Sequence, residues 1–143
     1  MDLRFAKESD VPLLADLNRQ LIEDEQSPTS LSLSELELRM TAWLQGDYEA
    51  ILFKEGGNPA GYALIRPAEP GWYVRQFFVL RNLRRTGVGR RAFKLLRDSP
   101  KLRDEPIFLE VLERNEIGRA FWISLGFEQN ALLLRLAPPV GAA

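Results

Sequence analysis

Residues 72–97 constrain the fold of this chain more than any other stretch, because they combine a strand pattern, an arginine-rich turn, paired glycines and a helix pattern. Residues 72–80 are mostly aromatic or β-branched, which is typical of a strand. After Gly89, apolar residues recur at helical spacing at Ala92, Phe93, Leu95 and Leu96. The stretch therefore predicts a strand that passes through a glycine turn into a helix.

The two glycines before this helix indicate a site for phosphate. Gly87 and Gly89 would let the backbone approach a ligand closely, and the first N–H groups of a helix have no acceptor within it. These donors and the positive end of the helix dipole favour a bound anion. Positive charge is added by Arg84, Arg85, Arg90 and Arg91.

Two segments carry a resemblance to a known family. Arg84-x-x-Gly87-x-Gly89 resembles the acyl-CoA signature of the GNAT superfamily of N-acetyltransferases, whose loop backbone wraps the pyrophosphate of coenzyme A. A second segment resembles that family's N…A…FY…xGF pattern and consists of Asn115, Ala120, Phe121, Trp122 and residues 125–127. The resemblance implies a single-domain α/β fold with a mixed central β-sheet flanked by helices, in which strands 4 and 5 splay apart around the pantetheine arm.

The resemblance also implies a reaction, the direct transfer of an acetyl group from acetyl-CoA to an amine, without a metal. A backbone N–H near Phe78 or Val79 would bind the thioester carbonyl. The residues expected at the coenzyme are Phe78, Val79, Arg84, Arg85, Thr86, Gly87, Val88, Gly89, Arg90, Asn115, Phe121 and Trp122. The acceptor is expected to be a small-molecule or peptide amine, which no motif identifies. Many relatives dimerise, so by analogy a homodimer is a possible assembly.

Acid–base chemistry in this chain has few candidates, because the sequence contains no cysteine and no histidine. Trp122 replaces a tyrosine that many family members carry, and an indole is not a useful acid. The acid that protonates the leaving thiolate is therefore expected to be Tyr73, Tyr62, Tyr48 or water.

The base is equally open. Glu110 is one candidate, and the alternative is that it pairs with Arg75 across the sheet. Residues 23–25 form an acidic run that would attract a cationic amine or simply face solvent. The catalytic residues proposed from the sequence are thus Glu110 and Tyr73.

Other functions fit parts of the pattern. The replacement of tyrosine by Trp122 would suit a sensor domain that holds acyl-CoA without turnover. Residues 87–92 satisfy the dinucleotide fingerprint G-x-G-x-x-A, with Glu110 near the expected distance for the ribose. Against that alternative, six residues separate the strand from the first glycine, and too little chain follows for a doubly wound sheet. A turn without any ligand would not need so many arginines.

Length and charge limit the class of protein. A chain of 143 residues predicts one domain, here residues 1–137, with a frayed tail at 138–143. A net charge of −1 does not favour nucleic acid or a membrane surface. No run of 18 apolar residues and no signal peptide is present, so a cytoplasmic protein is expected.

The remaining elements follow from periodicity and breakers. Residues 3–6, 48–53, 60–66, 107–112 and 132–136 are expected as strands, with a hairpin turn at 56–59. A first helix is expected after a Ser9 cap, with Pro12 in its first turn and Ser27-Pro28 at its end. A second is expected after Ser34, with Leu36, Met40, Trp43 and Leu44 inward. The last helix is expected over 115–125, capped by Asn115 and closed by Gly126.

Overall fold

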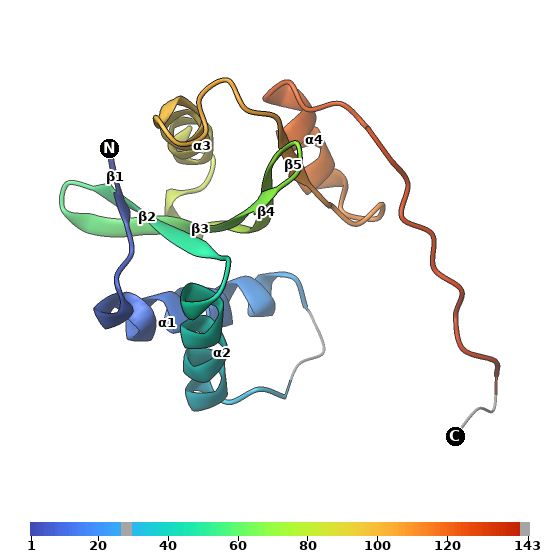
Figure 1. Cartoon of the computed structure of the whole chain (residues 1–143), viewed down its shortest axis with the longest axis horizontal. Helices are drawn as coiled ribbons and strands as arrows, with labels where there is room; N and C mark the ends of the chain where they lie inside the picture. Colours follow the sequence, from blue (N-terminus) through green and yellow to red (C-terminus); the bar gives the residue numbers. More distant parts are fainter. Residues whose placement is uncertain (27–29, 141–143) are drawn as a thin grey trace. The chain divides into compact units, whose positions relative to one another are not determined.

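The computed structural model describes residues 1–26 and 30–140 and has an α/β fold built on one five-stranded sheet. The strands are β1 (Asp2–Phe5), β2 (Glu49–Glu55), β3 (Asn58–Ala68), β4 (Gly71–Val79) and β5 (Ile107–Leu109). They lie side by side in chain order; the first four are antiparallel, and β5 runs parallel to β4 (Figure 1). The prediction of a mixed sheet in an α/β fold is confirmed.

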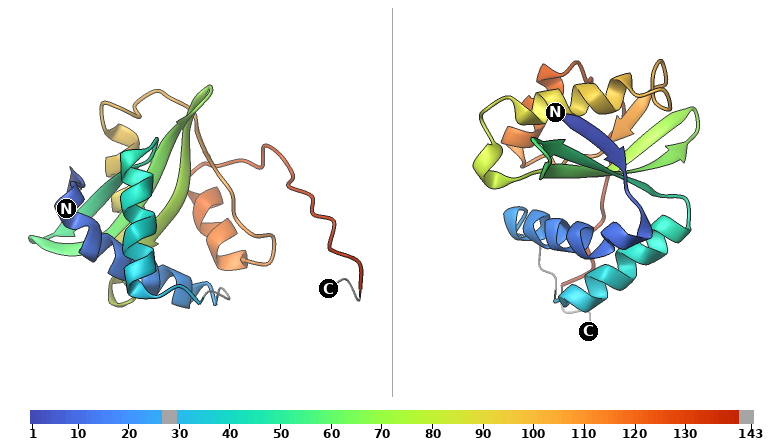
Figure 2. Two further views of the ribbon diagram at one scale, coloured as in Figure 1. Left: turned by 60° about the horizontal axis from the view of Figure 1, so that its bottom comes forward. Right: turned by 90° about the vertical axis from the view of Figure 1, so that its left-hand side faces the viewer.

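The chain divides into two compact units, Met1–Glu110 and Val111–Ala143, and the whole sheet lies in the first. In that unit, α1 (Val11–Asp24) and α2 (Leu33–Gln45) cover one face of the sheet, and α3 (Val88–Asp98) covers the other (Figure 2). The central strand β3 is buried from residue 60 to 65, as expected for a strand with helices on both sides.

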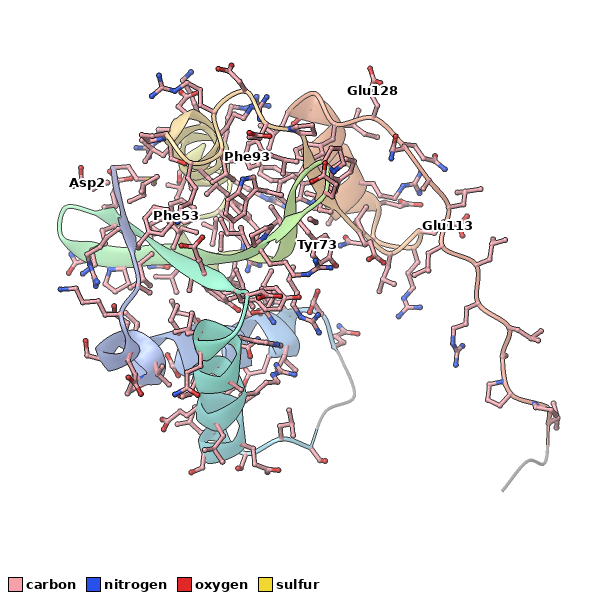
Figure 3. The ribbon with its side chains drawn as sticks, in the orientation of Figure 1. Asp2, Phe53, Tyr73, Phe93, Glu113 and Glu128 are labelled. Carbon is pink, nitrogen blue, oxygen red and sulfur yellow. The ribbon has the colours of Figure 1, made fainter. Side chains whose placement is uncertain are left out.

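Separate sets of side chains fill the two faces of the sheet. On the α1–α2 face, the buried residues include Leu14, Leu17, Met40, Tyr62 and Phe78, so the inward Met40 of the second helix is confirmed. On the α3 face, the rings of Phe53, Phe77 and Phe93 form a chain with centroids 5.8 and 6.3 Å apart; Figure 3 labels Phe53 and Phe93 there.

The predicted hairpin turn between β2 and β3 is confirmed at Gly56 and Gly57. Both glycines have positive φ, 58° and 83°. Positive φ at both central positions defines the tight turn whose twist matches that of the flanking strands.

Strand β4 has two irregularities that shape the region beyond its centre. Leu64 pairs with Gln76 and Ile65 with Val74, so Arg75 is an extra, bulged residue. Pairing with β5 stops at Val74 and Leu109, whereas β4 continues to Val79. The two strands therefore share only a short ladder, as the expected splay of strands 4 and 5 requires.

Two helix starts differ from the sequence expectation. Ser9 lies in a short 3-10 turn (Glu8–Asp10) and no side chain caps α1. Ser32, not Ser34, caps α2, because it forms a reciprocal pair of hydrogen bonds with Glu35. The Ser27-Pro28 stop signal lies outside the described residues.

The second unit contains α4 (Glu116–Ser124), which confirms the predicted last helix. Asn115 caps it by accepting a hydrogen bond from the Gly118 N–H (2.9 Å). At the other end Gly126 has φ 100°, and the N–H groups of Gly126 and Phe127 donate to the carbonyls of Ile123 and Trp122. These are the two bonds of a Schellman ending.

The predicted final strand at residues 132–136 is wrong. These residues have no regular secondary structure, and Leu132, Leu133, Leu134 and Leu136 are exposed. The apolar pattern alone does not form a strand, because a strand needs a partner for its backbone groups. Residues 111–140 contain α4 but no strand, so none of them provides such a partner. The expected tail, 138–143, lies partly beyond the described residues, and the single-domain boundary at 137 stays a prediction.

None of the helices within 1–26 and 30–140 combines the length and the apolar character that crossing a membrane requires.

An ion pair beside α1 makes stability depend on pH. Both guanidinium nitrogens of Arg4 donate to Asp10 (2.8 and 2.9 Å) and, with the Lys7 N–H, lower the pKa of Asp10 to about 2. A carboxyl whose pKa is lower in the folded protein than in the unfolded chain stabilises the fold at pH values above its ordinary pKa. This contribution is lost as pH falls from about 4 to 2. We expect Asp10→Asn to lower the free energy of unfolding at neutral pH by at most about 2 kcal/mol, because Arg4 is partly exposed.

Urea unfolding at pH 7 and pH 3 measures this effect. The difference in the free energy of unfolding between variant and parent should be smaller at the lower pH. Asp47→Asn removes a carboxylate that makes no ion pair among the described residues and serves as the control. A gap that stays constant with pH would contradict the prediction.

A glycine of β3 sets the spacing of the sheet at the end of β4. A Cβ at Gly61 would lie 2.0 Å from the carbonyl oxygen of Phe78. We expect Gly61→Ala to destabilise the protein by about 3 kcal/mol, because backbone on both strands must move. Gly46→Ala is the matched control, since its Cβ would meet its nearest atom at 3.5 Å. Equal urea midpoints for the two variants would refute this prediction.

Candidate functional site

The loop between β4 and α3 has the backbone shape that the glycine pattern predicts. It begins with a 3-10 turn (Arg81–Leu83), and Arg85 then takes φ 63°. The Thr86 hydroxyl donates to the Leu83 carbonyl, which closes the turn. Gly87 follows at φ 81°, a left-handed conformation that glycine adopts without steric cost, and α3 starts at the next residue.

The first turn of α3 presents backbone donors at this loop. The first helical hydrogen bond runs from the Arg91 N–H to the Gly87 carbonyl (3.0 Å). The N–H groups of residues 88–90 precede it, and helix geometry gives them no acceptor within α3. The Val88 side chain is buried, so only its backbone is available to a ligand, whereas Arg85 and Arg90 are exposed.

Arg84, which the family resemblance places at the coenzyme, is held by protein groups. Its Nε donates to the Val79 carbonyl (3.0 Å), and its guanidinium lies 5.4 Å from the centre of the Phe78 ring. Asp24, at the end of α1, accepts from both Arg84 and Arg81. Burial raises the pKa of Asp24, but these two guanidiniums outweigh burial and lower it. Arg84 thus ties the loop to α1 and β4.

The acidic run at residues 23–25 is largely paired within the chain. Glu23 accepts from Arg19 (2.7 Å), and Asp24 holds Arg81 and Arg84. Two of the three carboxylates are therefore committed to neighbouring arginines. The role of Asp24 as an anchor for the loop has no signal in the sequence, because its partners lie 57 and 60 residues away.

Phe78 and Val79 offer only their backbone to a ligand. Their side chains are 2% and 9% exposed, and the Phe78 ring packs against Tyr62. Both residues lie in the part of β4 that extends past its pairing with β5. The expected thioester contact therefore falls on a stretch whose backbone β5 does not cover.

Tyr73 and Glu110 meet at the parallel ladder. The Tyr73 hydroxyl donates to Glu110 Oε1 (3.3 Å), and Glu110 follows directly after β5, which ends three residues earlier than predicted. Burial, then the charge of Glu110 and this hydrogen bond, raise the pKa of Tyr73. The expected pairing of Glu110 with Arg75 is wrong, because Arg75 donates to the Tyr48 hydroxyl (3.2 Å).

The three candidate tyrosines have different environments. Tyr62 is fully buried, donates to Gln76 Oε1 (2.7 Å), and has its pKa raised by burial. The Tyr48 hydroxyl accepts from Arg75. Tyr73 alone among the three has a carboxylate as its hydrogen-bond partner, so it is the tyrosine best placed to exchange a proton.

The second unit brings together the other expected site residues. The Trp122 ring stands edge-on to Phe121 and Phe127, with centroids 4.9 and 5.3 Å apart. The contact with Phe127 is the apolar contact that accompanies a Schellman ending. Asn115 is occupied as the helix cap. Contact of Asn115, Phe121 and Trp122 with the coenzyme stays a prediction.

Comparison with solved structures shows the same fold. A mutant of the BH1408 protein from Bacillus halodurans is 22% identical, with a TM-score of 0.74 over 97% of this chain and 100% of that one. A predicted acetyltransferase from Clostridium acetobutylicum, solved with acetyl-CoA, is 18% identical, with a TM-score of 0.72 over 95% of each chain. The aminoglycoside N-acetyltransferase AAC(6')-Iy, solved with CoA, is 16% identical, with a TM-score of 0.76 over 96% of this chain and 93% of that one.

Among curated proteins, none matches this sequence. The model of the Acetyltransferase (GNAT) family matches residues 15–127, a range that includes β4, the glycine loop, α3 and α4. The loop geometry, the short ladder between β4 and β5, and this match agree. The chain belongs to the GNAT family of acetyltransferases.

Proposed function

We propose that the protein transfers an acetyl group from acetyl-CoA to an amine. The observation that carries the proposal is the left-handed Gly87 between β4 and α3, at a loop that resembles the family's acyl-CoA signature and lies within the matched residues 15–127. The exposed Arg85 and Arg90 flank the backbone donors of residues 88–90 and supply positive charge for the phosphates. Two of the similar structures were solved with acetyl-CoA or CoA, which supports this choice of donor.

Tyr73 and Glu110 would handle the protons of the transfer. Glu110 would accept a proton from the ammonium of the acceptor, and the free amine would attack the thioester carbonyl. Tyr73 would give its proton to the leaving thiolate and recover one from Glu110 through their hydrogen bond. The freed Glu110 carboxylate would then take the second proton that the nitrogen loses as the amide forms, and release it to water. The Tyr73 hydroxyl is protonated at neutral pH, as an acid must be, and its raised pKa moves ionisation further from neutrality.

Isothermal titration with acetyl-CoA, followed by thiol release across a panel of amines, tests the function. We expect saturable binding and turnover with at least one amine. The panel should include amino acids, aminoglycosides, polyamines and peptide N-termini. Lack of binding at millimolar acetyl-CoA would refute the proposal.

A non-catalytic acyl-CoA sensor is the second candidate. It is favoured by Trp122, which stands where many relatives have tyrosine and packs between Phe121 and Phe127. Binding of acetyl-CoA without thiol release for any amine would favour this alternative. Turnover on the order of one per second would exclude it.

A further inference from the structure

A group of arginines and aromatic rings, called here the basic-aromatic cluster, lies on the α2 side of the sheet. It joins α2, the connection from α2 to β2, β3 and β4, and consists of Arg39, Arg66, Arg75, Trp43, Tyr48 and Tyr73. The guanidiniums of Arg39 and Arg75 lie 4.5 and 5.0 Å from the centre of the same Trp43 ring. Arg66 lies 4.9 Å from the centre of the Tyr73 ring, which Figure 3 labels on β4.

The arginines of this cluster have no carboxylate partner among the described residues. Arg39 donates to Asn18 Oδ1 (2.8 Å), Arg75 to the Tyr48 hydroxyl, and Arg66 to a backbone carbonyl. In contrast, Arg4 pairs with Asp10 and Arg84 with Asp24. The cluster therefore carries positive charge that the described part of the chain does not neutralise.

One donor in the cluster is buried without an acceptor. The Nε atom of Arg39 has no hydrogen-bond partner within residues 1–26 and 30–140, and neither has the amide nitrogen of the fully buried Asn18 beside it. Leaving a buried donor unpaired costs free energy, more so for a charged group. An anion at the guanidinium of Arg39 would offset part of this cost by stabilising its charge.

The charges also repel one another. Burial and the neighbouring charge of Arg75 both lower the pKa of Arg39. The bulge at Arg75 contributes to this closeness of two positive charges, because it places an extra residue of β4 opposite α2. An oxyanion bound by both guanidiniums would offset the repulsion and accept charge-assisted hydrogen bonds.

The opposite charge lies next to this cluster. Tyr73, whose ring Arg66 covers, donates to the carboxylate of Glu110. One end of the region thus suits an ammonium group and the other suits an oxyanion. Polycationic amines would meet the arginines unfavourably, whereas an amine with its own negative group would match both ends.

We propose that Arg39 and Arg75 bind an oxyanion of the acceptor, so that the acceptor is a small amine that also carries a carboxylate or a phosphate. The proposal names the substrate class of the proposed acetyl transfer and rests on that function. Arg66 holds Tyr73 beside Glu110 at the amine end.

Acceptors that share an aminoethyl group test the substrate class directly. β-Alanine carries a carboxylate, phosphoethanolamine a phosphate, and ethanolamine neither. We expect kcat/KM for the better of the two anionic acceptors to exceed that for ethanolamine by about 10- to 100-fold, mainly through KM. The better one identifies the oxyanion as carboxylate or phosphate. Spermidine should be the poorest acceptor, and equal kcat/KM for all four would overturn the assignment.

Variants locate the effect. Arg39→Gln and Arg75→Gln should each lower the ratio of kcat/KM for the better anionic acceptor to kcat/KM for ethanolamine by about tenfold. Arg75→Lys keeps the charge and should retain part of the preference. Arg103→Gln, an exposed arginine outside the cluster, is the matched control. Melting temperatures identify any variant that has lost its fold, and Arg75→Lys then carries the comparison.

A binding measurement separates this proposal from the proposed function. Inorganic phosphate and malonate are titrated into the protein without acetyl-CoA, at constant ionic strength. Saturable binding that Arg39→Gln and Arg75→Gln weaken at least tenfold supports the anion site. Equal binding by parent and both variants overturns it, even if acetyl transfer is found. Failure to bind acetyl-CoA, with the anion titration intact, refutes only the proposed function.

Discussion

Gly89→Val is expected to abolish acetyl-CoA binding while most of the fold remains. Gly89 is the second residue of α3, two positions after the left-handed Gly87, where the proposed function has the backbone approach the pyrophosphate. A branched side chain there would fill the space that the phosphate needs. Titration with acetyl-CoA and thermal melting, run on the same preparations, measure the two effects separately.

A matched control uses the same new side chain elsewhere on the same helix. Lys94→Val places valine on the exposed part of α3, one and a half turns further along. It should bind acetyl-CoA as the parent does. If Gly89→Val also binds as the parent does, the loop is not the phosphate site, and the proposed function loses its main support.

Other changes near the coenzyme should have smaller effects than Gly89→Val. Arg90→Ala removes an exposed positive charge, which is worth about 1 kcal/mol or less in affinity. Arg84→Ala should act through the position of the loop, because Asp24 and the Val79 carbonyl hold the Arg84 side chain. Trp122→Phe should be the mildest, since Phe can keep the contacts with Phe121 and Phe127.

The elements that the sequence predicted well are those with local signals. The aromatic run before the loop and the apolar spacing after Gly89 place β4 and α3 within one or two residues of their observed ends. Gly126 closes α4 at positive φ, as a helix ending with glycine predicts. In each case the signal lies within the same few residues that adopt the structure.

The features that sequence reasoning missed depend on distant partners. The bulge at Arg75 appears only in the register of β3 against β4. The strand expected at residues 132–136 has the right composition, but composition does not supply a neighbouring strand. Asp24 becomes an anchor because the loop between β4 and α3 folds back onto α1. Its sequence neighbours Glu23 and Glu25 are also carboxylates, so the sequence does not single out Asp24.

The candidate catalytic pair illustrates the same limit. Glu110 and Tyr73 were candidates by residue type, but nothing in the spacing of positions 37 residues apart predicts their hydrogen bond. It arises because β4 and β5 run parallel with Tyr73 opposite Phe108. The sequence therefore named the residues, and the sheet register selects their partners.

Glu110→Gln and Tyr73→Phe are each expected to lower kcat about 10²- to 10⁴-fold and to leave the acetyl-CoA affinity unchanged. Each removes one end of the same proton path, so the double variant should be little worse than either single one. Tyr73→Phe should also remove the fall in kcat at alkaline pH, because the parent loses its acid when Tyr73 ionises above its raised pKa.

Matched controls separate catalysis from stability. Glu105→Gln replaces an exposed carboxylate of the same unit with a carboxamide, and it should leave kcat unchanged. Tyr62→Phe removes a buried hydroxyl that donates to Gln76, so it should lower the melting temperature but leave kcat close to that of the parent. A single-turnover assay with bound acetyl-CoA reports the chemical step. If Tyr73→Phe and Glu110→Gln keep parental rates in that assay, the protons travel through water or other groups, and the pair serves only to hold β4 against β5.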